Sequence, residues 1–287
     1  MSIAICCVYY LAKPEDIEIL KLQLSYIRRT TRDYKILAAC SKVDEAALGL
    51  LSGSEDVIVC DFPKTDAQGS REHAYYLDLL CRRAAEDGFD YICTFDMDSF
   101  PICEGWQQLP ATAIKSLGFD VVGAVRKENM DAVLVHPSFT FFSADWYRQH
   151  QPEFFPPREK VKQQAPKYLR AYRQTPDTGI GITLKLGQTR GRFFALPRTN
   201  LYDFHYLMAG VYGNIVFHLG ASSRKALRFR GDKPGPGHRR EVFLHNMSTR
   251  EAIVAQLLSD SDGFMDKLCL IGAAPSPKAQ PEDLPEE

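Results

Sequence analysis

The sequence FDYICTFDMDSFP, at residues 89–101, combines a strand-like apolar run with two closely spaced carboxylates. Residues 91–95 are apolar, aromatic or β-branched and follow the turn residues Asp87 and Gly88, which predicts a buried β-strand. Asp96 and Asp98 then fall at the carboxyl end of that strand, where ligands bind in open α/β sheets. Two carboxylates this close repel each other, and a divalent cation relieves the repulsion. The sequence therefore predicts a metal site, held by Asp96 and Asp98, at the end of a central strand.

The residues before this run alternate between strand and helix patterns. Residues 3–10 are almost continuously apolar, as expected of a central parallel strand that is covered on both faces. Further strands are predicted at 34–40 and 57–60, and helices at 17–27, 43–51 and 71–85. This order predicts a mostly parallel central sheet with right-handed crossovers and helices on both faces. We therefore expect an α/β, Rossmann-like fold in which residues 1–101 form a nucleotide-binding half.

The residues after this run predict a second half of the same domain, at 102–272. Strands are expected at 120–125, 133–142, 193–196 and 215–217, and helices at 158–173, 180–186 and 249–258. Small polar and aromatic residues alternate over 138–142, which favours a strand with one face open to a site. Residues 158–173 are rich in Lys and Arg, as is typical of a solvated helix. No linker divides the chain before residues 273–287, whose Pro, Ala and Glu content predicts a disordered tail.

The composition narrows the class of protein and its cellular location. A net charge of -1 with 25% charged residues gives no overall attraction to nucleic acid, so we expect no nucleic-acid partner. The 8 cysteines form no C-x-x-C pair, which predicts buried thiols in a reducing cytoplasm rather than disulfides. The first residues lack the basic leader of a signal peptide, and no apolar run approaches the roughly 20 residues of a membrane helix. We expect a cytoplasmic protein, with peripheral contact at the inner face of the membrane as the alternative.

Three residues of the first half are candidates for binding a nucleotide. Ser70 and His73 open the helix predicted at 71–85, and a helix N-terminus favours phosphate oxygens. A solvated first-turn residue is the open alternative for His73. Tyr9 or Tyr10 ends the first strand, where an aromatic ring can stack on a nucleobase, although ordinary packing explains either tyrosine. We name Tyr9, Ser70 and His73 as candidates.

Three residues of the second half are candidates for the chemistry itself. Asp177 precedes the helix predicted at 180–186, where it serves as an N-cap, as a general base, or as both. His218 ends a late strand and is either a metal ligand or a hydrogen-bonded core histidine. Arg224 follows it and offers a fixed positive charge to an anionic ligand.

These pieces, in this order, resemble glycosyltransferases of the GT-A fold, and most of all the family-2-like bacterial enzymes that use nucleotide-diphosphate sugars. The sequence FDMDSFP at 95–101, with Gly105-Trp106 after it, is similar to the metal-binding D-x-D strand of that family. GSREH at 69–73 resembles its S-x-x-H helix start, DTG at 177–179 resembles the segment that carries the acceptor-side base, and HLGAS at 218–222 resembles its late histidine. Met97 is an unusual middle residue, and the E-D and Q-x-x-R-W signatures of processive synthases are missing. A processive polymerase is therefore not expected.

The resemblance implies a metal-dependent transferase that moves a sugar from a nucleotide-diphosphate donor, UDP- or GDP-linked, to a hydroxyl of a glycan, polysaccharide or lipid-linked saccharide. Transfer with inversion is expected, with Asp177 as the base. Asp96, Asp98 and His218 would hold Mn²⁺ or Mg²⁺, and the donor would contact Tyr9, Ser70, His73, Asp96 and Arg224. The basic segment at 224–240 is interpreted either as a lid over the diphosphate or as a contact with anionic lipid.

Three other classes of protein remain as alternatives. A haloacid-dehalogenase-like phosphatase also carries Asp-x-Asp after a strand, but normally after the first strand and followed by Thr. A nucleotidyltransferase would carry a glycine-rich basic signature after the first strand, where this chain has Ala12-Lys13-Pro14. A non-catalytic protein that binds a sugar nucleotide on the same fold is the third alternative.

Overall fold

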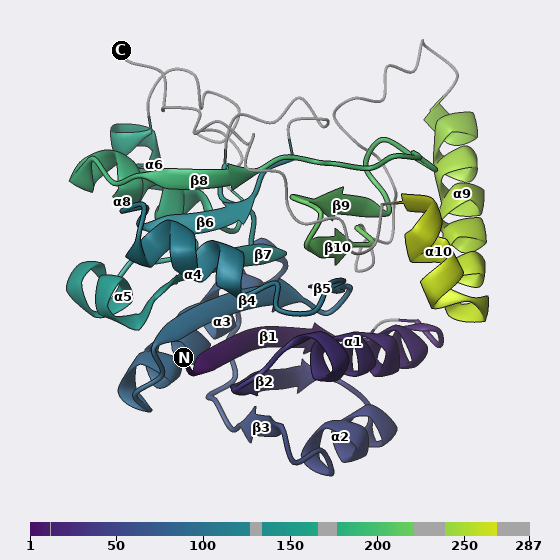
Figure 1. The fold of residues 1–287 in the computed structure, drawn as a ribbon, viewed down its shortest axis with the longest axis horizontal. Helices are drawn as coiled ribbons and strands as arrows, with labels where there is room; N and C mark the ends of the chain where they lie inside the picture. The colour runs from purple at the N-terminus through teal and green to yellow at the C-terminus, as the bar shows by residue number, and fades with distance from the viewer. Residues whose placement is uncertain (12, 127–133, 166–176, 221–238, 269–287) are drawn as a thin grey trace.

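The structure, a computed structural model, describes residues 1–11, 13–126, 134–165, 177–220 and 239–268, with only the backbone for 239–243 (Figure 1). Its larger sheet has seven strands in the order β3-β2-β1-β4-β7-β6-β8. These strands are β1 (Ile3–Tyr10), β2 (Tyr34–Lys42), β3 (Val57–Cys60), β4 (Tyr91–Asp96), β6 (Val121–Ala124), β7 (Phe139–Ser143) and β8 (Phe193–Leu196). The helices are α1 (Asp16–Thr30), α2 (Glu45–Ser52), α3 (Ser70–Glu86), α4 (Gln108–Lys115), α5 (Ala144–His150), α6 (Arg158–Gln164), α8 (Ile180–Thr189), α9 (Arg239–Ser259) and α10 (Ser261–Leu268). The predicted α/β class with a mostly parallel central sheet is confirmed.

The first half of the chain forms the parallel side of this sheet. β1 lies between β2 and β4, and Ile3 pairs with Tyr34 on one side and with Tyr91 on the other. All of its residues except Tyr10 are buried. Because every parallel neighbour runs the same way, the carboxyl ends of β1, β2 and β4 lie at one edge of the sheet. Asp96, the last residue of β4, therefore lies at the edge where a ligand is expected.

Helices cover both faces of the sheet, as the sequence predicts. On one face, alternate β1 residues, including Ile5 and Cys7, pack with apolar residues of α1, α2 and α4. On the other face, Ala4 and Cys6 pack with apolar residues of α3, α5 and α8. This alternation follows from the two-residue repeat of a β-strand, which sends neighbouring side chains to opposite faces.

The second half continues the same sheet, with one difference from the expected strands. β7 runs antiparallel to both β4 and β6, and β6 pairs with β8 in parallel. The strand predicted over 133–142 begins only at Phe139, because Phe139 N–H donates to His136 O and closes a turn that contains Pro137. Residues 127–133 lie outside the described part of the chain.

A small second sheet, which the sequence did not predict, carries the late histidine. It has the order β5-β10-β9, made of β5 (Ser99–Pro101), β10 (Val216–His218) and β9 (Gly210–Tyr212). His218 pairs with Ser99 in this sheet, and Leu219 N–H donates to Asp98 O at 2.9 Å. Two residues 120 positions apart in sequence, Asp98 and His218, are thus adjacent in space.

Helices α9 and α10 pack beside the small sheet (Figure 1). α9 begins at Arg239, ten residues before the predicted start at Thr249, and α10 was not predicted. Helix-favouring residues such as Arg, Glu, Leu and Met precede Thr249, so nothing local starts the helix there. No helix in the described ranges has the length and apolar character needed to cross a membrane.

Two glycines of α8 test how closely this helix packs against the segment that follows α5. A Cβ at Gly181 would lie 1.7 Å from Glu153 O, whereas a Cβ at Gly187 would meet nothing within 4 Å. We expect Gly181→Ala to lower the free energy of unfolding by about 3 kcal/mol or more, because backbone must move. Gly187→Ala, the matched control, should raise it by about 0.5–1 kcal/mol, because alanine favours the helix. Urea unfolding measures both, and equal effects of the two substitutions would contradict the described packing.

Candidate functional site

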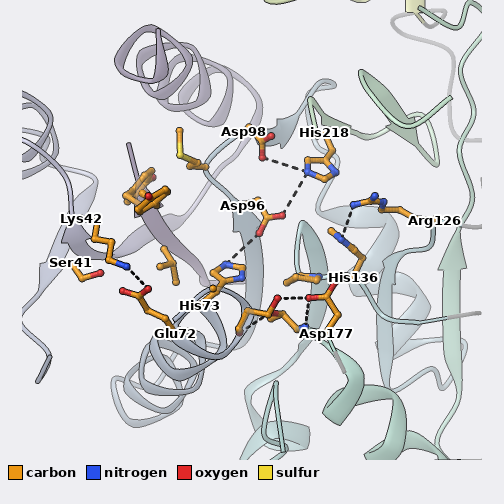
Figure 2. A pocket seen from close by; sticks show the side chains of 18 residues that line it. Ser41, Lys42, Glu72, His73, Asp96, Asp98, Arg126, His136, Asp177 and His218 are labelled. Atoms are coloured by element: carbon orange, nitrogen blue, oxygen red, sulfur yellow. Dashed lines mark hydrogen bonds and ion pairs between the residues drawn. The ribbon is translucent and has the colours of Figure 1, made fainter. Parts of the chain in front are cut away.

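A pocket of about 470 Å³ opens at the carboxyl edge of the sheet (Figure 2). The ends of β1 and β2, the start of α3, the turn after β4 and His218 each contribute to its wall. Arg126, His136, Asp177 and Thr178 complete the wall from the second half of the chain. The pocket therefore draws on both halves, and it contains most of the residues that the sequence identified.

Two carboxylates and an imidazole meet at one end of this pocket. His218 Nε2 lies 3.4 Å from Asp98 Oδ1 and 3.7 Å from Asp96 Oδ2. One ligand atom from each of Asp96, Asp98 and His218 can be chosen so that all lie within 4.8 Å of one another. Asp98 and His218 have side chains only 5% exposed, so their positions are set by packing. The structure brings the three predicted metal ligands together.

The donor set fits a divalent cation. Asp96 Oδ1 is buried and accepts no hydrogen bond from any described residue. Burial raises the pKa of Asp96, and the nearby histidines His73 and His218 oppose that shift. Carboxylate oxygens suit Mg²⁺ and Mn²⁺, and an imidazole shifts the preference toward Mn²⁺. The residues present thus have the chemistry, the spacing and the unsatisfied oxygen that such an ion requires.

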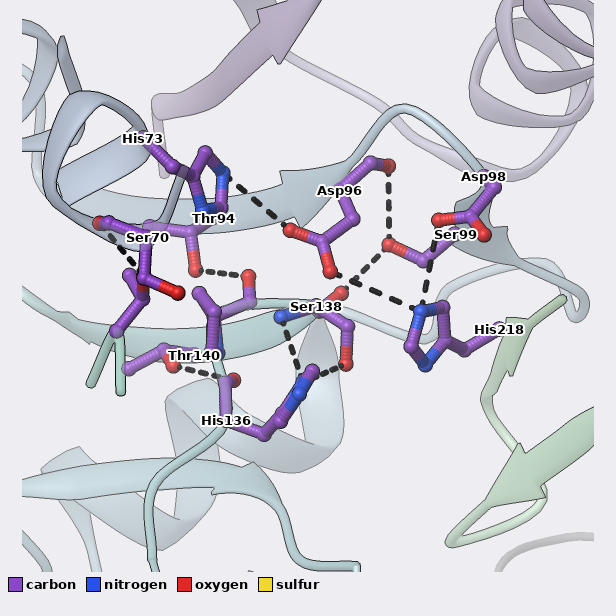
Figure 3. Close-up of polar contacts among 12 residues, drawn as sticks. Ser70, His73, Thr94, Asp96, Asp98, Ser99, His136, Ser138, Thr140 and His218 are labelled. Carbon is purple, nitrogen blue, oxygen red and sulfur yellow. Dashed lines mark hydrogen bonds and ion pairs between the residues drawn. The ribbon is translucent and has the colours of Figure 1, made fainter. Parts of the chain in front are cut away.

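The turn that carries the two aspartates is fixed by buried hydrogen bonds. Gln23, fully buried on α1, donates its side-chain amide to Asp96 O and to Ser99 O, both at 2.8 Å. The Ser99 hydroxyl contacts Asp96 O at 3.1 Å and Ser138 O at 2.6 Å (Figure 3). These contacts hold the backbone from the helix side and from the neighbouring strand, so the carboxylates have little freedom to move apart.

His73 reaches the acid pair from α3. Its Nε2 lies 3.4 Å from Asp96 Oδ1, and Figure 3 shows His73, Asp96, His218 and Asp98 joined in one chain of contacts. α3 starts after Gly69, whose φ of 60° suits glycine, and no side chain caps this helix start. His73 thus faces the pocket with Asp96, as predicted; its role in phosphate binding stays a prediction.

Asp177 lies across the pocket, and its surroundings decide between the two interpretations of its position. The N-cap position of α8 is occupied by Gly179, with φ of 95°, and no side chain caps that helix. The interpretation of Asp177 as the N-cap is therefore wrong. Instead, Asp177 Oδ1 accepts hydrogen bonds from the Ser70 hydroxyl at 2.6 Å and from Thr178 N–H at 2.9 Å.

Ser70 and Thr178 form a reciprocal link between the two halves of the chain. The Ser70 hydroxyl donates to Asp177, and the Thr178 hydroxyl donates to Ser70 O at 2.9 Å. Ser70, predicted to contact a phosphate, has its hydroxyl engaged with the candidate base in this structure. The hydrogen bond from the Ser70 hydroxyl orients the Asp177 carboxylate toward the pocket.

Tyr9 differs from the expectation. Its side chain is fully buried in the core, so the ring has no surface on which a base could stack. The two-residue repeat of β1 sends Tyr9 inward and leaves Tyr10 partly exposed at the pocket. Tyr10 is therefore the tyrosine that the structure makes available for stacking. Arg224 and residues 224–238 lie outside the described part of the chain.

Among the pocket residues that sequence reasoning missed are Arg126 and His136. Arg126 Nη1 lies 3.1 Å from His136 Nε2, and His136 Nδ1 lies 2.7 Å from Ser138 Oγ. The ring centroids of His136 and His218 are 5.5 Å apart. The one usable signal was the alternation of small polar and aromatic residues over 138–142, which pointed to an open strand face without identifying His136.

Comparisons with known proteins find similarity at the level of structure. No protein-family model matches the sequence, and no curated protein matches it. A mannosyltransferase from Pyrobaculum calidifontis, PcManGT, in complex with GDP-Man and Mn²⁺, matches 54% of this chain and 47% of its own length, with 12% identity and a TM-score of 0.41. A structure of residues 1–349 of S. aureus TarS matches 54% of this chain and 50% of the chain in that structure, with 10% identity and a TM-score of 0.39. LgtC, in a structure of an active-site mutant, matches 65% of this chain and 70% of its own length, with 11% identity and a TM-score of 0.40.

The chain spans about half the length of the first two of these structures. Similarity at this level says nothing about activity, which has to be argued from the residues of the site.

A second pocket, of about 1090 Å³, lies along the other side of α3 and contains a perturbed carboxylate. Asp78 lines it and accepts a hydrogen bond from Phe154 N–H at 2.9 Å. Burial raises the pKa of Asp78 from its ordinary value of 3.8 to about 7. The folded protein therefore holds a proton on Asp78 between about pH 4 and 7, where the unfolded chain has released it.

This shift predicts a loss of stability with rising pH. Between about pH 4 and 7 the folded state binds more protons at Asp78, so the free energy of unfolding falls as pH rises. Asp78→Asn keeps an acceptor for Phe154 N–H and removes the titration. We expect the free energy of unfolding of the variant to exceed that of the wild type by about 2–4 kcal/mol at pH 8. At pH 4 the difference should be much smaller, because Asp78 is then protonated in the folded wild type as well. Urea unfolding across this range tests it, with the exposed Asp61→Asn as control; a pH-independent difference would contradict the assignment.

Proposed function

We propose that this protein is a metal-dependent glycosyltransferase that uses a nucleotide-diphosphate sugar. The observation that carries the proposal is the Asp96–Asp98–His218 group with Asp177 across the same pocket. Such a transfer needs a centre that binds a diphosphate and a base that faces the acceptor, and this pocket offers candidates for both.

Asp96, Asp98 and His218 would hold Mn²⁺ or Mg²⁺. When bound, such an ion supplies positive charge that stabilises the negative charge developing on a departing diphosphate. His73 and Arg126 lie near Asp96 and add positive or hydrogen-bonding groups to the same wall. The uncapped start of α3 adds backbone N–H groups, which favour phosphate oxygens.

Asp177 is the residue that would accept the proton of the acceptor. In the transfer, the acceptor hydroxyl oxygen bonds to the anomeric carbon and gives its proton to the Asp177 carboxylate. The bond between the anomeric carbon and the phosphate oxygen breaks, and the nucleoside diphosphate leaves with the electron pair. A base on the face opposite the leaving group leads to inversion. Ser70, through its hydrogen bond to Asp177 Oδ1, is a positioning residue for this step.

The acceptor is proposed to be a hydroxyl of a saccharide, free or lipid-linked. A haloacid-dehalogenase-like phosphatase has less support, because the acid pair follows β4 rather than the first strand and is followed by Ser99. A non-catalytic binding protein is separated from an enzyme by measuring turnover of the donor.

The metal ligands provide the first test. We expect the wild type with Mn²⁺ to release nucleoside diphosphate from a UDP- or GDP-sugar, by slow hydrolysis even without an acceptor. Asp98→Asn should lower this rate by at least about a hundredfold, since one charged ligand is lost. Release of nucleoside diphosphate, measured with and without EDTA, checks this. Full activity in EDTA would contradict the metal assignment, and no turnover with any donor would favour a binding protein.

The candidate base provides the second test. We expect Asp177→Asn to lower kcat by about 10²–10⁴-fold, as for loss of a general base, while affinity for nucleoside diphosphate and Mn²⁺ stays near that of the wild type. Asp145→Asn, at a side chain that is 89% exposed, is the matched control and should leave both quantities unchanged. Steady-state kinetics and calorimetry make the two measurements. An unchanged kcat would remove Asp177 from the mechanism.

A further inference from the structure

A pair of opposite charges lines the pocket on the side away from the acid pair. Lys42, at the end of β2, and Glu72, in the first turn of α3, form an ion pair with an Nζ–Oε2 distance of 2.5 Å. Figure 2 shows them, with Ser41, across the pocket from Asp98, His218 and Arg126. Neither residue has a part in holding a cation or in proton transfer, so their function is not accounted for by the site described above.

An aromatic ring lies beside this pair. Tyr10 ends β1 and pairs in register with Lys42 of β2, and Lys42 Nζ is 5.4 Å from the centroid of the Tyr10 ring. The ring is partly exposed and lines the pocket. A planar base could use such a ring for stacking, which by itself does not distinguish one base from another.

The two ends of the pocket differ in chemistry, so a nucleotide-diphosphate sugar is expected to bind in one orientation. Its diphosphate belongs beside Asp96, Asp98 and His218, and its sugar must face Asp177 for transfer to occur. The space beside Tyr10, Lys42 and Glu72 then remains for the nucleoside. This orientation rests on the proposed function.

The charges of the pair define which base edge fits best. A carboxylate only accepts hydrogen bonds, and an ammonium group only donates them. Guanine presents the O6 acceptor directly beside two donors, N1–H and the N2 amino group. A carboxylate can accept both donors in a bidentate manner while the ammonium group donates to O6.

The other bases satisfy this pair less well. Uracil presents O4, N3–H and O2, so its second carbonyl would face a carboxylate oxygen. Adenine and cytosine each present one donor group beside an acceptor, which leaves a carboxylate oxygen without a ring N–H partner. A site built to hydrogen-bond a given edge rejects analogues that leave its polar groups unpaired.

We propose that Lys42 and Glu72 recognise the base of the donor and select guanosine diphosphate sugars. Glu72 accepts N1–H and the N2 amino group, and Lys42 donates to O6. The Glu72 side chain is only 13% exposed and is oriented by its ion pair with Lys42, so its carboxylate is ordered before the nucleotide binds.

Calorimetry of nucleoside diphosphates with Mn²⁺ tests this directly. We expect GDP to bind at least tenfold more tightly than UDP, ADP or CDP. Inosine diphosphate, which lacks only the N2 amino group, should bind about tenfold more weakly than GDP, because a hydrogen bond to a charged group is lost. This comparison needs no variant and therefore does not depend on how a substitution affects folding.

A substitution then assigns the selectivity to its residue. Glu72→Gln keeps the shape of the side chain but has one acceptor in place of two. We expect it to weaken GDP binding by about tenfold or more and to abolish the difference between GDP and inosine diphosphate, with UDP little affected. Glu55→Gln, at an exposed position outside the pocket, is the matched control. It should bind GDP, inosine diphosphate and UDP with the affinities of the wild type.

The outcomes separate this proposal from the proposed function. If no nucleoside diphosphate binds in the presence of Mn²⁺, both fail. If nucleoside diphosphates bind but UDP, ADP or CDP binds as tightly as GDP, only the selection of guanosine is overturned. If GDP is preferred but Glu72→Gln retains the full difference between GDP and inosine diphosphate, the selection does not come from Glu72, and the proposal fails in that form.

Discussion

The repulsion between the Asp96 and Asp98 carboxylates is the constraint on which the rest of this structure depends. Left to themselves, two such groups would turn apart toward water. Here Gln23 and Ser99 fix the backbone between them, and the small sheet brings His218 against both. Elements from widely separated parts of the sequence thus act together to keep two like charges close, and a protein retains such an arrangement where an ion or a charged ligand compensates for it.

The parts of the fold with strong local patterns were predictable from the sequence. β1, β3 and β8 have the predicted bounds, because a continuous apolar run between turn residues specifies a strand with little help from elsewhere. The three-residue strands β5 and β9 carry no such pattern. They exist because β10 pairs with them, which is a long-range property that no window of sequence contains.

The residues of the site likewise divide into those that local sequence patterns identify and those that only long-range contacts bring together. Asp96 and His218 end strands and Asp98 lies in the turn after β4, so their positions relative to the sheet edge could be deduced. Asp177 was left between two roles, because an aspartate before a helix is a common cap; only the placement of Gly179 at the cap removed one of them. Tyr9 and Tyr10 could not be separated without knowing which face of β1 each residue meets. Lys42 and Glu72 were overlooked because a lysine and a glutamate 30 positions apart look like ordinary surface residues until β2 and α3 bring them together.

The course of the large sheet has a consequence for any fragment of this chain. The strands of residues 1–101 and those that follow belong to one sheet, in which β4 lies between β1 and β7. A polypeptide that ended at Pro101 would leave the backbone hydrogen-bonding groups of β4 exposed along an apolar border. Such a border recruits other chains in the manner of an unpaired sheet edge. Residues 1–101 are thus not an autonomous folding unit, because β7, from the later part of the chain, pairs with the edge of β4 that they would otherwise leave open.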